Sequence, residues 1–398
     1  MTPEIKQRIE QIRRGEVPEG YKKGKLGVVP EEWEETSFSS LFTSTSDYTD
    51  DLEKYPLYSL TIEDGVTPKT ERYERSHLVK KEDSYKIVRP NDYAYNPMNL
   101  CFGSVARHKG NSPVAVSGYY DIFTTVHKSD LPFMDSFLTC DPMITYYNRV
   151  STGSLVEKQR VHFSQFLEFV LPLPSINERA KIAAILTTQD KVIELKEKRL
   201  AEKQRQKKYL MQQLLTGKKR LPGFSKEWKS VRLRNTLNVC HGQNQRNVEQ
   251  ENGVYPILGT GGEIGRTNDF LYDKPCILIG RKGSINKPMY METPFWTIDT
   301  LFYCKIKSGY HPKFLFFKFQ SINWNKYDES SGVPRLNAST IGSVDIFAPE
   351  FPEQTAIAEV LSAADREIDL LRQDIEQEKQ KKKALMQLLF TGIARVKT

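Results

Sequence analysis

A long internal repeat constrains the fold of this chain more than any other feature. The segment from Pro174 to Gly217 aligns without a gap with the segment from Pro349 to Gly392, at a constant offset of 175 residues. Of the 44 aligned positions 16 are identical, whereas unrelated segments of ordinary composition would share about two or three. We therefore expect the same local structure to be built twice.

Both copies of the repeat have the signals of a helix. Ser175 and Glu178 have the spacing of a capping box at the start of the first copy, and Pro352 lies where a first-turn proline is tolerated in the second. Gly217 and Gly392 end the two copies and suit the left-handed position that follows a helix. The repeat therefore predicts two long helices.

A seven-residue ladder of apolar side chains runs through each predicted helix. The ladder comprises Leu186, Ile193, Leu200, Lys207 and Leu214 in the first copy, and Leu361, Ile368, Ile375, Lys382 and Leu389 in the second. This spacing is typical of a coiled-coil seam, in which a polar residue lowers stability and helps to fix the register. The lysine at the same rung of both copies either has that role or extends out of an ordinary helix pair into water.

The segments that precede the two helices are alike in plan. Trp33 and Trp228 lie near their starts, and Arg160 and Arg335 match near their ends at the offset of 175. Short apolar runs between turns, such as residues 276–280 and 166–171, predict strands. Because a globular segment begins directly after the first helix, the second helix must run back antiparallel to pack on the first.

We therefore predict an α+β fold with a pseudo-two-fold internal repeat. Two globular mixed α/β domains alternate in it with two long helices, which form an antiparallel coiled coil. The expected boundaries are 1–20 for an N-terminal helical segment, 21–173 for the first globular domain, 174–217 for the first helical region, 218–348 for the second globular domain and 349–398 for the second helical region.

Composition limits the compartment and the class of partner. The net charge of +8, from 58 Lys and Arg against 50 Asp and Glu, permits a nucleic acid or another polyanion as partner. The five cysteines are scattered without a C-x-x-C pair, which predicts reduced thiols and no zinc site. No apolar run reaches the ~18 residues of a membrane helix, and the charged N-terminus does not resemble a secretory signal. We expect a cytoplasmic protein with no membrane partner.

Motifs of catalysis are weak in this sequence. The glycine-rich segment 259–265 misses the dinucleotide-binding pattern by one position, and the phosphate-loop motif does not occur. Residues 95–99, Tyr-Asn-Pro-Met-Asn, only faintly resemble the Asn-Pro-Pro-aromatic motif of amino-methylating enzymes. The sequence therefore favours a binding protein that has no catalytic residues, metal or cofactor of its own.

Two polar loops have side chains that suit DNA recognition. Arginine and lysine can donate to guanine, and asparagine can bridge the N6 and N7 atoms of adenine. The candidates are Arg107, His108, Lys109 and Arg160 in the first globular segment, and Arg281, Lys282, Ser284, Asn286, Arg335 and Asn337 in the second. The matched positions of Arg160 and Arg335 favour a phosphate contact, or an ion pair that holds the fold, over base recognition. Either loop could instead be a solvated hairpin tip.

Several of these segments together resemble the specificity subunits of type I restriction-modification systems. They are YKKGKLGVVPEEW near the N-terminus, KKYLMQQLLTGKKRLPGF after the first helix, ILIGRKGSI, and FPEQTAIAEVL with KKKALMQLLFTG in the second helix. The resemblance covers essentially the whole chain. One departure is Ser-Ile-Asn-Glu178, which replaces the usual Pro-Glu-Gln that Phe-Pro-Glu-Gln354 retains.

The resemblance implies that each globular domain is a target recognition domain for one half of a split DNA site, with the antiparallel helices fixing the gap. Two modification subunits would bring S-adenosylmethionine for adenine methylation. Two restriction subunits would add ATP- and Mg-dependent translocation and cleavage. This chain would supply the specificity alone and bind none of these cofactors itself.

Two other functions compete with this interpretation. A fused methyltransferase-nuclease would need a cofactor loop and an intact Asn-Pro-Pro-aromatic motif. A coiled-coil adaptor without a DNA role would not need the positive net charge or two different polar surfaces on matched frames. A gel shift with random-sequence duplex at low and high salt separates an adaptor from a DNA-binding subunit.

Overall fold

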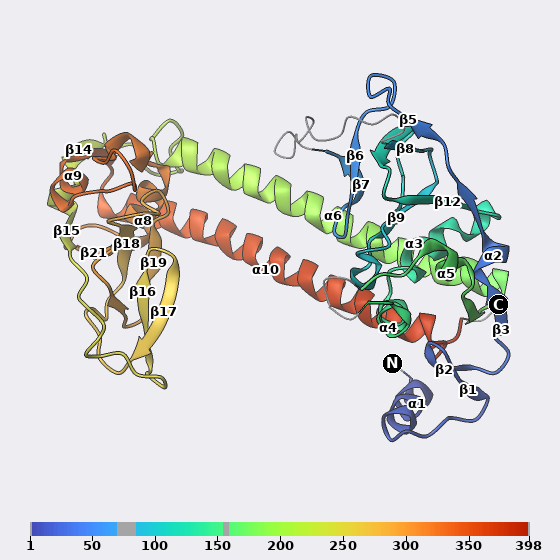
Figure 1. Ribbon diagram of the computed structural model, residues 1–398. Coiled ribbons are helices and arrows are strands. Elements are labelled where there is room, and N and C mark those ends of the chain that lie inside the picture. Colours follow the sequence, from blue (N-terminus) through green and yellow to red (C-terminus); the bar gives the residue numbers. More distant parts are fainter. Residues whose placement is uncertain (1, 70–84, 154–158, 397–398) are drawn as a thin grey trace. The chain divides into compact units, whose positions relative to one another are not determined.

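The computed structural model describes residues 2–69, 85–153 and 159–396 (Figure 1). The chain divides into two compact units, which are described separately below. Unit 1 consists of Met1–Leu195 and Ile375–Thr398, and unit 2 is Lys196–Asp374. Two long helices, α6 (Ile176–Leu214) and α10 (Phe351–Phe390), belong in part to each unit. The boundary between the units falls after Leu195 in α6 and after Asp374 in α10. Among the described residues, no helix is both long and apolar enough to cross a membrane.

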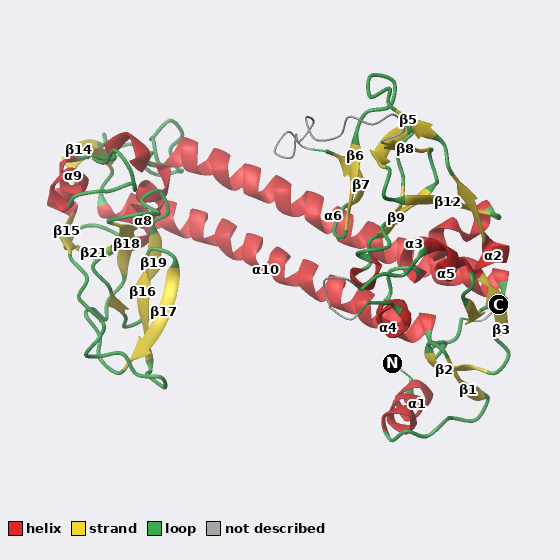
Figure 2. Ribbon diagram, in the orientation of Figure 1, coloured by secondary structure: helices red, strands yellow, loops and turns green. Residues whose placement is uncertain are grey.

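Unit 1 is built from short strands and short helices around the ends of α6 and α10 (Figure 2). Its strands are β1 (Tyr21–Gly24), β2 (Gly27–Pro30), β3 (Glu34–Ser37), β4 (Phe42–Thr45), β5 (Tyr48–Thr49), β6 (Tyr58–Thr61), β7 (Gly65–Pro68), β8 (Tyr85–Val88), β9 (Tyr93–Tyr95), β10 (Val105–Arg107), β11 (Val114–Ser117), β12 (Asp121–Thr125) and β13 (Val170–Leu173). Its short helices are α1 (Pro3–Arg13), α2 (Phe38–Leu41), η3 (Leu100–Phe102), η4 (Lys128–Asp130), α3 (Leu131–Phe137), α4 (Asp141–Val150) and α5 (Phe163–Leu167). The larger sheets have the orders β10-β9-β12-β4 and β11-β8-β5.

Aromatic rings form the core of unit 1. Phe123 stacks on Tyr93 with 5.1 Å between ring centroids and meets Phe42 edge-on at 4.9 Å. Such aromatic pairs add about 0.5–1.5 kcal/mol each to the free energy gained by burial. Leu186 of α6 and Phe390 of α10 belong to the same buried cluster. The two long helices are therefore part of the core of this unit.

The apolar run 166–171 does not form the single strand that the sequence predicts. Phe166 lies in helix α5, and the strand β13 begins only at Val170. The rings of Phe163 and Phe166 are three residues apart and lie 5.8 Å from each other. Because residues three apart share one face of a helix, the run satisfies a helical turn before it enters the strand.

Unit 2 has a similar plan with different details. Its strands are β14 (Lys229–Arg232), β15 (Leu237–Cys240), β16 (Tyr255–Gly259), β17 (Gly262–Thr267), β18 (Cys276–Gly280), β19 (Met289–Met291), β20 (Trp296–Thr297), β21 (Leu301–Ile306) and β22 (Asp345–Ala348). Its short helices are α7 (Leu233–Thr236), α8 (Pro312–Ser321), η6 (Trp324–Tyr327) and α9 (Ala338–Ser343). The sheets have the orders β15-β21-β18-β19, β17-β16-β20 and β14-β22. All five residues of β18 are buried, which confirms the predicted strand at 276–280.

The two long helices pack antiparallel within each unit, as the sequence predicts. In unit 2, Lys196 pairs with Asp374 at 2.8 Å and Lys203 with Glu367 at 2.8 Å. Residue numbers therefore increase along α6 in the direction in which they decrease along α10, as in an antiparallel pair. Gly217 and Gly392 follow the helix ends with φ of 72° and 67°. These left-handed values confirm the predicted glycine positions.

Candidate nucleic-acid interface

A buried glutamate in the first turn of α10 anchors unit 2. Glu353 accepts hydrogen bonds at 2.6 Å from Nε and at 2.6 Å from Nη2 of Arg220, and one at 3.2 Å from Nε1 of Trp228. These bonds to Glu353 raise the pKa of the Arg220 guanidinium above its ordinary value. The three residues, which we call the anchor cluster of unit 2, join the end of α6, the start of β14 and the start of α10.

Unit 1 contains the same anchor cluster. Glu178 in the first turn of α6 accepts bonds at 2.7 and 2.9 Å from Arg395 and one at 3.3 Å from Trp33. Both the glutamate and the arginine differ from their counterparts in unit 2 by 175 residues. The internal repeat therefore specifies a matched buried ion pair, one at the base of each globular region.

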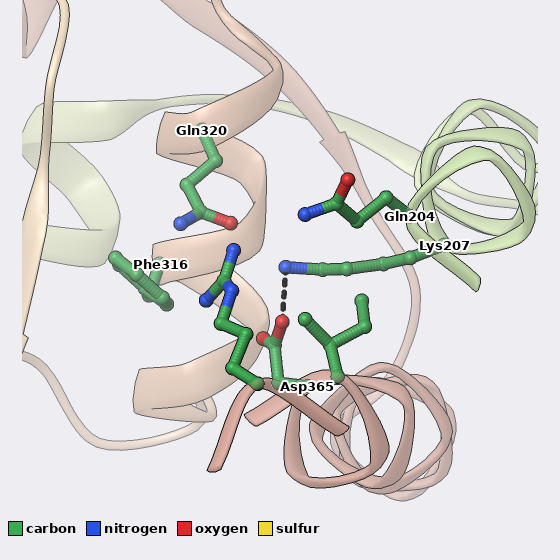
Figure 3. A pocket seen from close by; sticks show the side chains of 7 residues that line it. Gln204, Lys207, Phe316, Gln320 and Asp365 are labelled. Carbon is green, nitrogen blue, oxygen red and sulfur yellow. Dashed lines mark ion pairs between the residues drawn. The ribbon is translucent and has the colours of Figure 1, made fainter. Parts of the chain in front are cut away.

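The seam lysines form a second matched pair of contacts. Lys207 of α6 pairs with Asp365 of α10 in unit 2 (Figure 3), and Lys382 of α10 pairs with Asp190 of α6 in unit 1 at 2.5 Å. The ammonium group of Lys207 also lies 5.4 Å from the ring centroid of Phe317. Each lysine therefore contacts a carboxylate on the opposite helix.

The other seam residues are apolar and mostly buried. Leu186, Ile193, Leu214, Leu361, Ile368, Ile375 and Leu389 are buried, whereas Leu200 is partly exposed. Beside the seam lies a cleft of about 350 Å³ in unit 2, between α6, α8 and α10 (Figure 3). It is lined by Gln204, Lys207, Phe316, Gln320, Asp365, Ile368 and Arg372.

The first candidate DNA loop lies in unit 1 and is mostly engaged in the fold. The Arg107 side chain is only 17% exposed and binds Asp135 through Nε at 2.9 Å and Nη2 at 2.7 Å. His108 is 2% exposed, and its Nε2 lies 2.8 Å from a backbone carbonyl. Lys109 keeps 69% of its side chain exposed. Its ammonium group also lies 3.6 Å from Asp135, so Lys109 is the most exposed of these three candidates and shares that carboxylate with Arg107.

Arg160 lies in a short antiparallel bridge with Thr152. The backbone groups of the two residues exchange hydrogen bonds of 2.9 Å, and the next residue, Val161, is completely buried. Val161 in turn donates to the carbonyl of Pro97. The backbone bonds described for this segment therefore tie it to residues 97 and 152, and none of them reaches the 107–109 loop.

In unit 2 the structure brings two separately predicted segments together. Lys282, after β18, forms an antiparallel bridge with Arg335. The amide of Gly283 donates to the Pro334 carbonyl at 2.8 Å, and the amide of Leu336 donates to the Arg281 carbonyl at 3.0 Å. The side chains of Lys282 and Arg335 are both exposed, so they form a cationic doublet on the surface.

The remaining candidates of unit 2 surround this doublet. Arg281 is half-buried and donates to the carbonyl of Asp299 at 3.2 Å. Asn286 accepts a hydrogen bond at 3.0 Å from the amide of Trp324, and Asn337 contacts Glu329. Ser284 is exposed. Arg281, Asn286 and Asn337 therefore hold the loops in place, while the doublet is open to a phosphate group.

Comparison with known protein families shows which proteins this chain is similar to. The family model of the type I restriction modification DNA specificity domain matches residues 225–380. A protein of Methanocaldococcus jannaschii named putative type I restriction enzyme MjaX specificity subunit is 26% identical over 422 residues, which cover 96% of this chain and 98% of that one. The chain is similar to the specificity subunits of type I restriction-modification systems.

Other relatives agree with this family. The type I restriction enzyme MjaVIII specificity subunit of the same organism is 26% identical over 270 residues, which cover 58% of this chain and 64% of that one. The crystal structure of a type I restriction-modification S subunit from M. genitalium matches with a TM-score of 0.58 at 16% identity, covering 90% of this chain and 96% of that one. A chain from a structural study of complex assembly and conformational transition of the type I R-M system matches with a TM-score of 0.59 at 14% identity, covering 92% and 99%. The two structures show a shared fold.

The arginines of the anchor clusters were not identified from the sequence. Arg220 and Arg395 lie three residues beyond the last aligned glycines, at the same offset of 175. Extending the alignment by one helical turn would have found them. Within the described residues, no group of three or more His, Cys, Asp or Glu side chains is arranged to hold a metal ion.

Proposed function

We propose that this chain is a specificity subunit that reads a bipartite DNA site through two target recognition domains, residues 21–173 and 218–348. The observation that carries the proposal is the duplicated frame. The anchor clusters and the lysine–aspartate pairs recur at a constant offset, whereas the loops that they support differ between the units. A frame built twice with two different polar surfaces suits the recognition of two different half-sites.

The chemistry would belong to partner subunits. Two modification subunits would bring S-adenosylmethionine and methylate adenine, and two restriction subunits would use ATP and Mg for translocation and cleavage. The similarity to the jannaschii protein named putative type I restriction enzyme MjaX specificity subunit supports a place in such a complex. The complex would act in the cytoplasm, and this chain would select the DNA without binding a cofactor.

The described side chains suggest a division of labour at the DNA. The cationic doublet Lys282–Arg335 and the exposed Lys109 suit contacts to phosphates, which fix register and supply salt-dependent affinity. A substitution that removes one such cation should flatten the dependence of log Kd on log salt concentration by about 0.9. A coiled-coil adaptor would show no such dependence.

Co-expression with a cognate modification subunit tests the proposal. Methylated adenines in the host genome, mapped by single-molecule sequencing, should define one motif with two half-sites and a fixed gap. The purified chain alone should transfer no methyl group from S-adenosylmethionine and should bind duplex DNA more weakly at high salt. Salt-independent binding, or methyl transfer by the chain alone, would contradict the proposal.

A further inference from the structure

Two loops of unit 2 emerge at the same end of one sheet. Strands β15 and β18 both run antiparallel to β21, with Cys240 opposite Tyr303 and Gly280 opposite Leu301. Because the carboxyl ends of both strands lie where β21 begins, the loops that follow them leave from one edge. The loop after β18 carries the cationic doublet. The loop after β15, residues 241–252, contains none of the DNA-binding candidates named so far.

The start of the 241–252 loop is fixed by close backbone packing. The amide of Gln243 donates to the carbonyl of Thr297 at 2.8 Å, and Nε1 of the buried Trp296 donates to the carbonyl of Gln243 at 3.0 Å. A Cβ atom added to Gly242 would lie 2.0 Å from the carbonyl oxygen of Ile298, so only glycine permits this approach.

The other end of the same loop is fixed to β17. The amide of Gln250 donates to the carbonyl of Arg266 at 2.8 Å, and Glu249 forms a bridge with Thr267. The Glu249 carboxylate lies against Gly265, where an added Cβ would be 2.5 Å from it. The loop is thus held at both ends, and the Glu249 carboxylate packs against β17.

Between these two fixed ends, polar side chains project from the protein. Gln243, Asn244, Arg246 and Asn247 are all exposed. Inside the loop, the amide of Arg246 donates to Oδ1 of Asn244 at 2.9 Å, and the amide of Val248 donates to the carbonyl of Gln245 at 2.9 Å. The segment 243–247 is therefore an ordered surface of amides with one guanidinium and no carboxylate.

A chain of contacts connects this surface to the cationic doublet. The Ile298 amide donates to the Leu258 carbonyl at 3.0 Å, just before the turn that carries Thr260. The hydroxyl of Thr260 is 3.7 Å from the position of a Cβ on Gly283, next to Lys282. The 243–247 loop, the 259–262 turn and the 280–286 loop therefore converge.

We propose that residues 243–247 are a base-reading loop of the second recognition domain, specific for adenine-containing steps of its half-site, while the doublet Lys282–Arg335 holds the adjacent phosphates. Asparagine and glutamine amides can donate to adenine N7 and accept from adenine N6 at once. A loop that is ordered before binding loses little conformational freedom when it contacts a base. This inference rests on the proposed function.

The test uses the full chain co-purified with its cognate modification subunit and a library of randomised duplex DNA. The variant Gln243→Ala/Asn247→Ala removes two exposed amides from the loop. Its matched control is Asn235→Ala/Asn238→Ala, which removes two exposed amides at the opposite end of β15. Selected sequences and melting temperatures are compared for all three proteins.

We expect the loop variant to lose its preference for adenine at one or two positions of one half-site, by about tenfold or more, which is the effect of removing one bidentate contact. The other half-site, the melting temperature and the control should match the wild type. An unchanged consensus at every position would overturn the base-reading loop while the proposed function stands. A wild-type protein that selects no bipartite consensus would instead overturn the proposed function.

Discussion

The two units share the anchor cluster beside the first turn of a long helix, and they differ in the exposed loops of their globular regions. Both place a buried glutamate of a helix first turn between an arginine and a tryptophan. The candidate loops differ: Arg107 is bound to Asp135 in unit 1, whereas the doublet Lys282–Arg335 is open to solvent in unit 2. A buried carboxylate must keep its partners because an unpaired charge is costly there. A surface loop carries no such constraint and can differ between the units.

The largest expected effect comes from the anchor clusters. Glu178→Ala or Glu353→Ala should each lower the free energy of unfolding by about 1.5–3 kcal/mol, because each removes charge-assisted hydrogen bonds from an arginine and leaves the tryptophan Nε1 without its acceptor. Equilibrium urea unfolding measures this loss. The matched control is Glu350→Ala, one turn away, whose pair with Lys226 is 54% exposed on the glutamate side. It should cost less than about 1 kcal/mol. Equal losses for Glu350 and Glu353 variants would refute the anchoring role.

The seam lysines offer a finer comparison of equivalent positions. The side chain of Lys207 is 17% exposed and lies over Phe317, whereas that of Lys382 is 25% exposed and pairs with the more exposed Asp190. Lys382→Met should change the free energy of unfolding by less than about 1 kcal/mol. Lys207→Met should cost about 0.5–1 kcal/mol more, because it also removes the cation from the face of the ring. Identical unfolding curves for the two variants would mean that Lys207 and Lys382 contribute equally to stability.

A further difference between the units is the pH dependence of the stability of unit 2. Lys318 is buried and donates to the carbonyl of Leu215 at the end of α6, and burial lowers its pKa from 10.5 to about 8. Between pH 8 and 10.5 the unfolded chain holds a proton on Lys318 that the folded chain has released. The contribution of this group to stability therefore rises with pH in that window and is at its minimum below pH 8.

Lys318→Met removes this contribution. The difference between the unfolding free energies of the wild type and the variant, measured by urea titration at several pH values, should shift in favour of the wild type from pH 8 to pH 10. A difference that stays constant over this range would show that Lys318 keeps its ordinary pKa in the folded protein.

The helical parts of the fold were predictable because their signals are local and occur twice. The repeat predicted helices ending at Gly217 and Gly392, and α6 and α10 end within a few residues of them. Their antiparallel packing followed from the connectivity alone. The run 166–171 was misassigned because a short apolar stretch fits both a strand and a helical turn.

The candidate site was predictable only in part, since side-chain partners come from distant segments. The sequence suggested Lys282 and Arg335 separately, but nothing local indicated that they form one bridge. It suggested Arg107 as a DNA contact, yet Asp135, 28 residues away, holds that guanidinium. The amides of residues 243–247 were overlooked because an exposed polar loop has no distinctive pattern until its neighbours are known.

An exchange of one globular region tests the central claim most directly, namely that one frame carries two independent DNA readers. Residues 21–172 are replaced by the equivalent domain of another specificity subunit, and the hybrid is co-expressed with the modification subunit. Methylated adenines are then mapped across the host genome. We expect a motif in which one half-site is new and the other half-site is unchanged. A motif in which both half-sites change would contradict the independence of the two units.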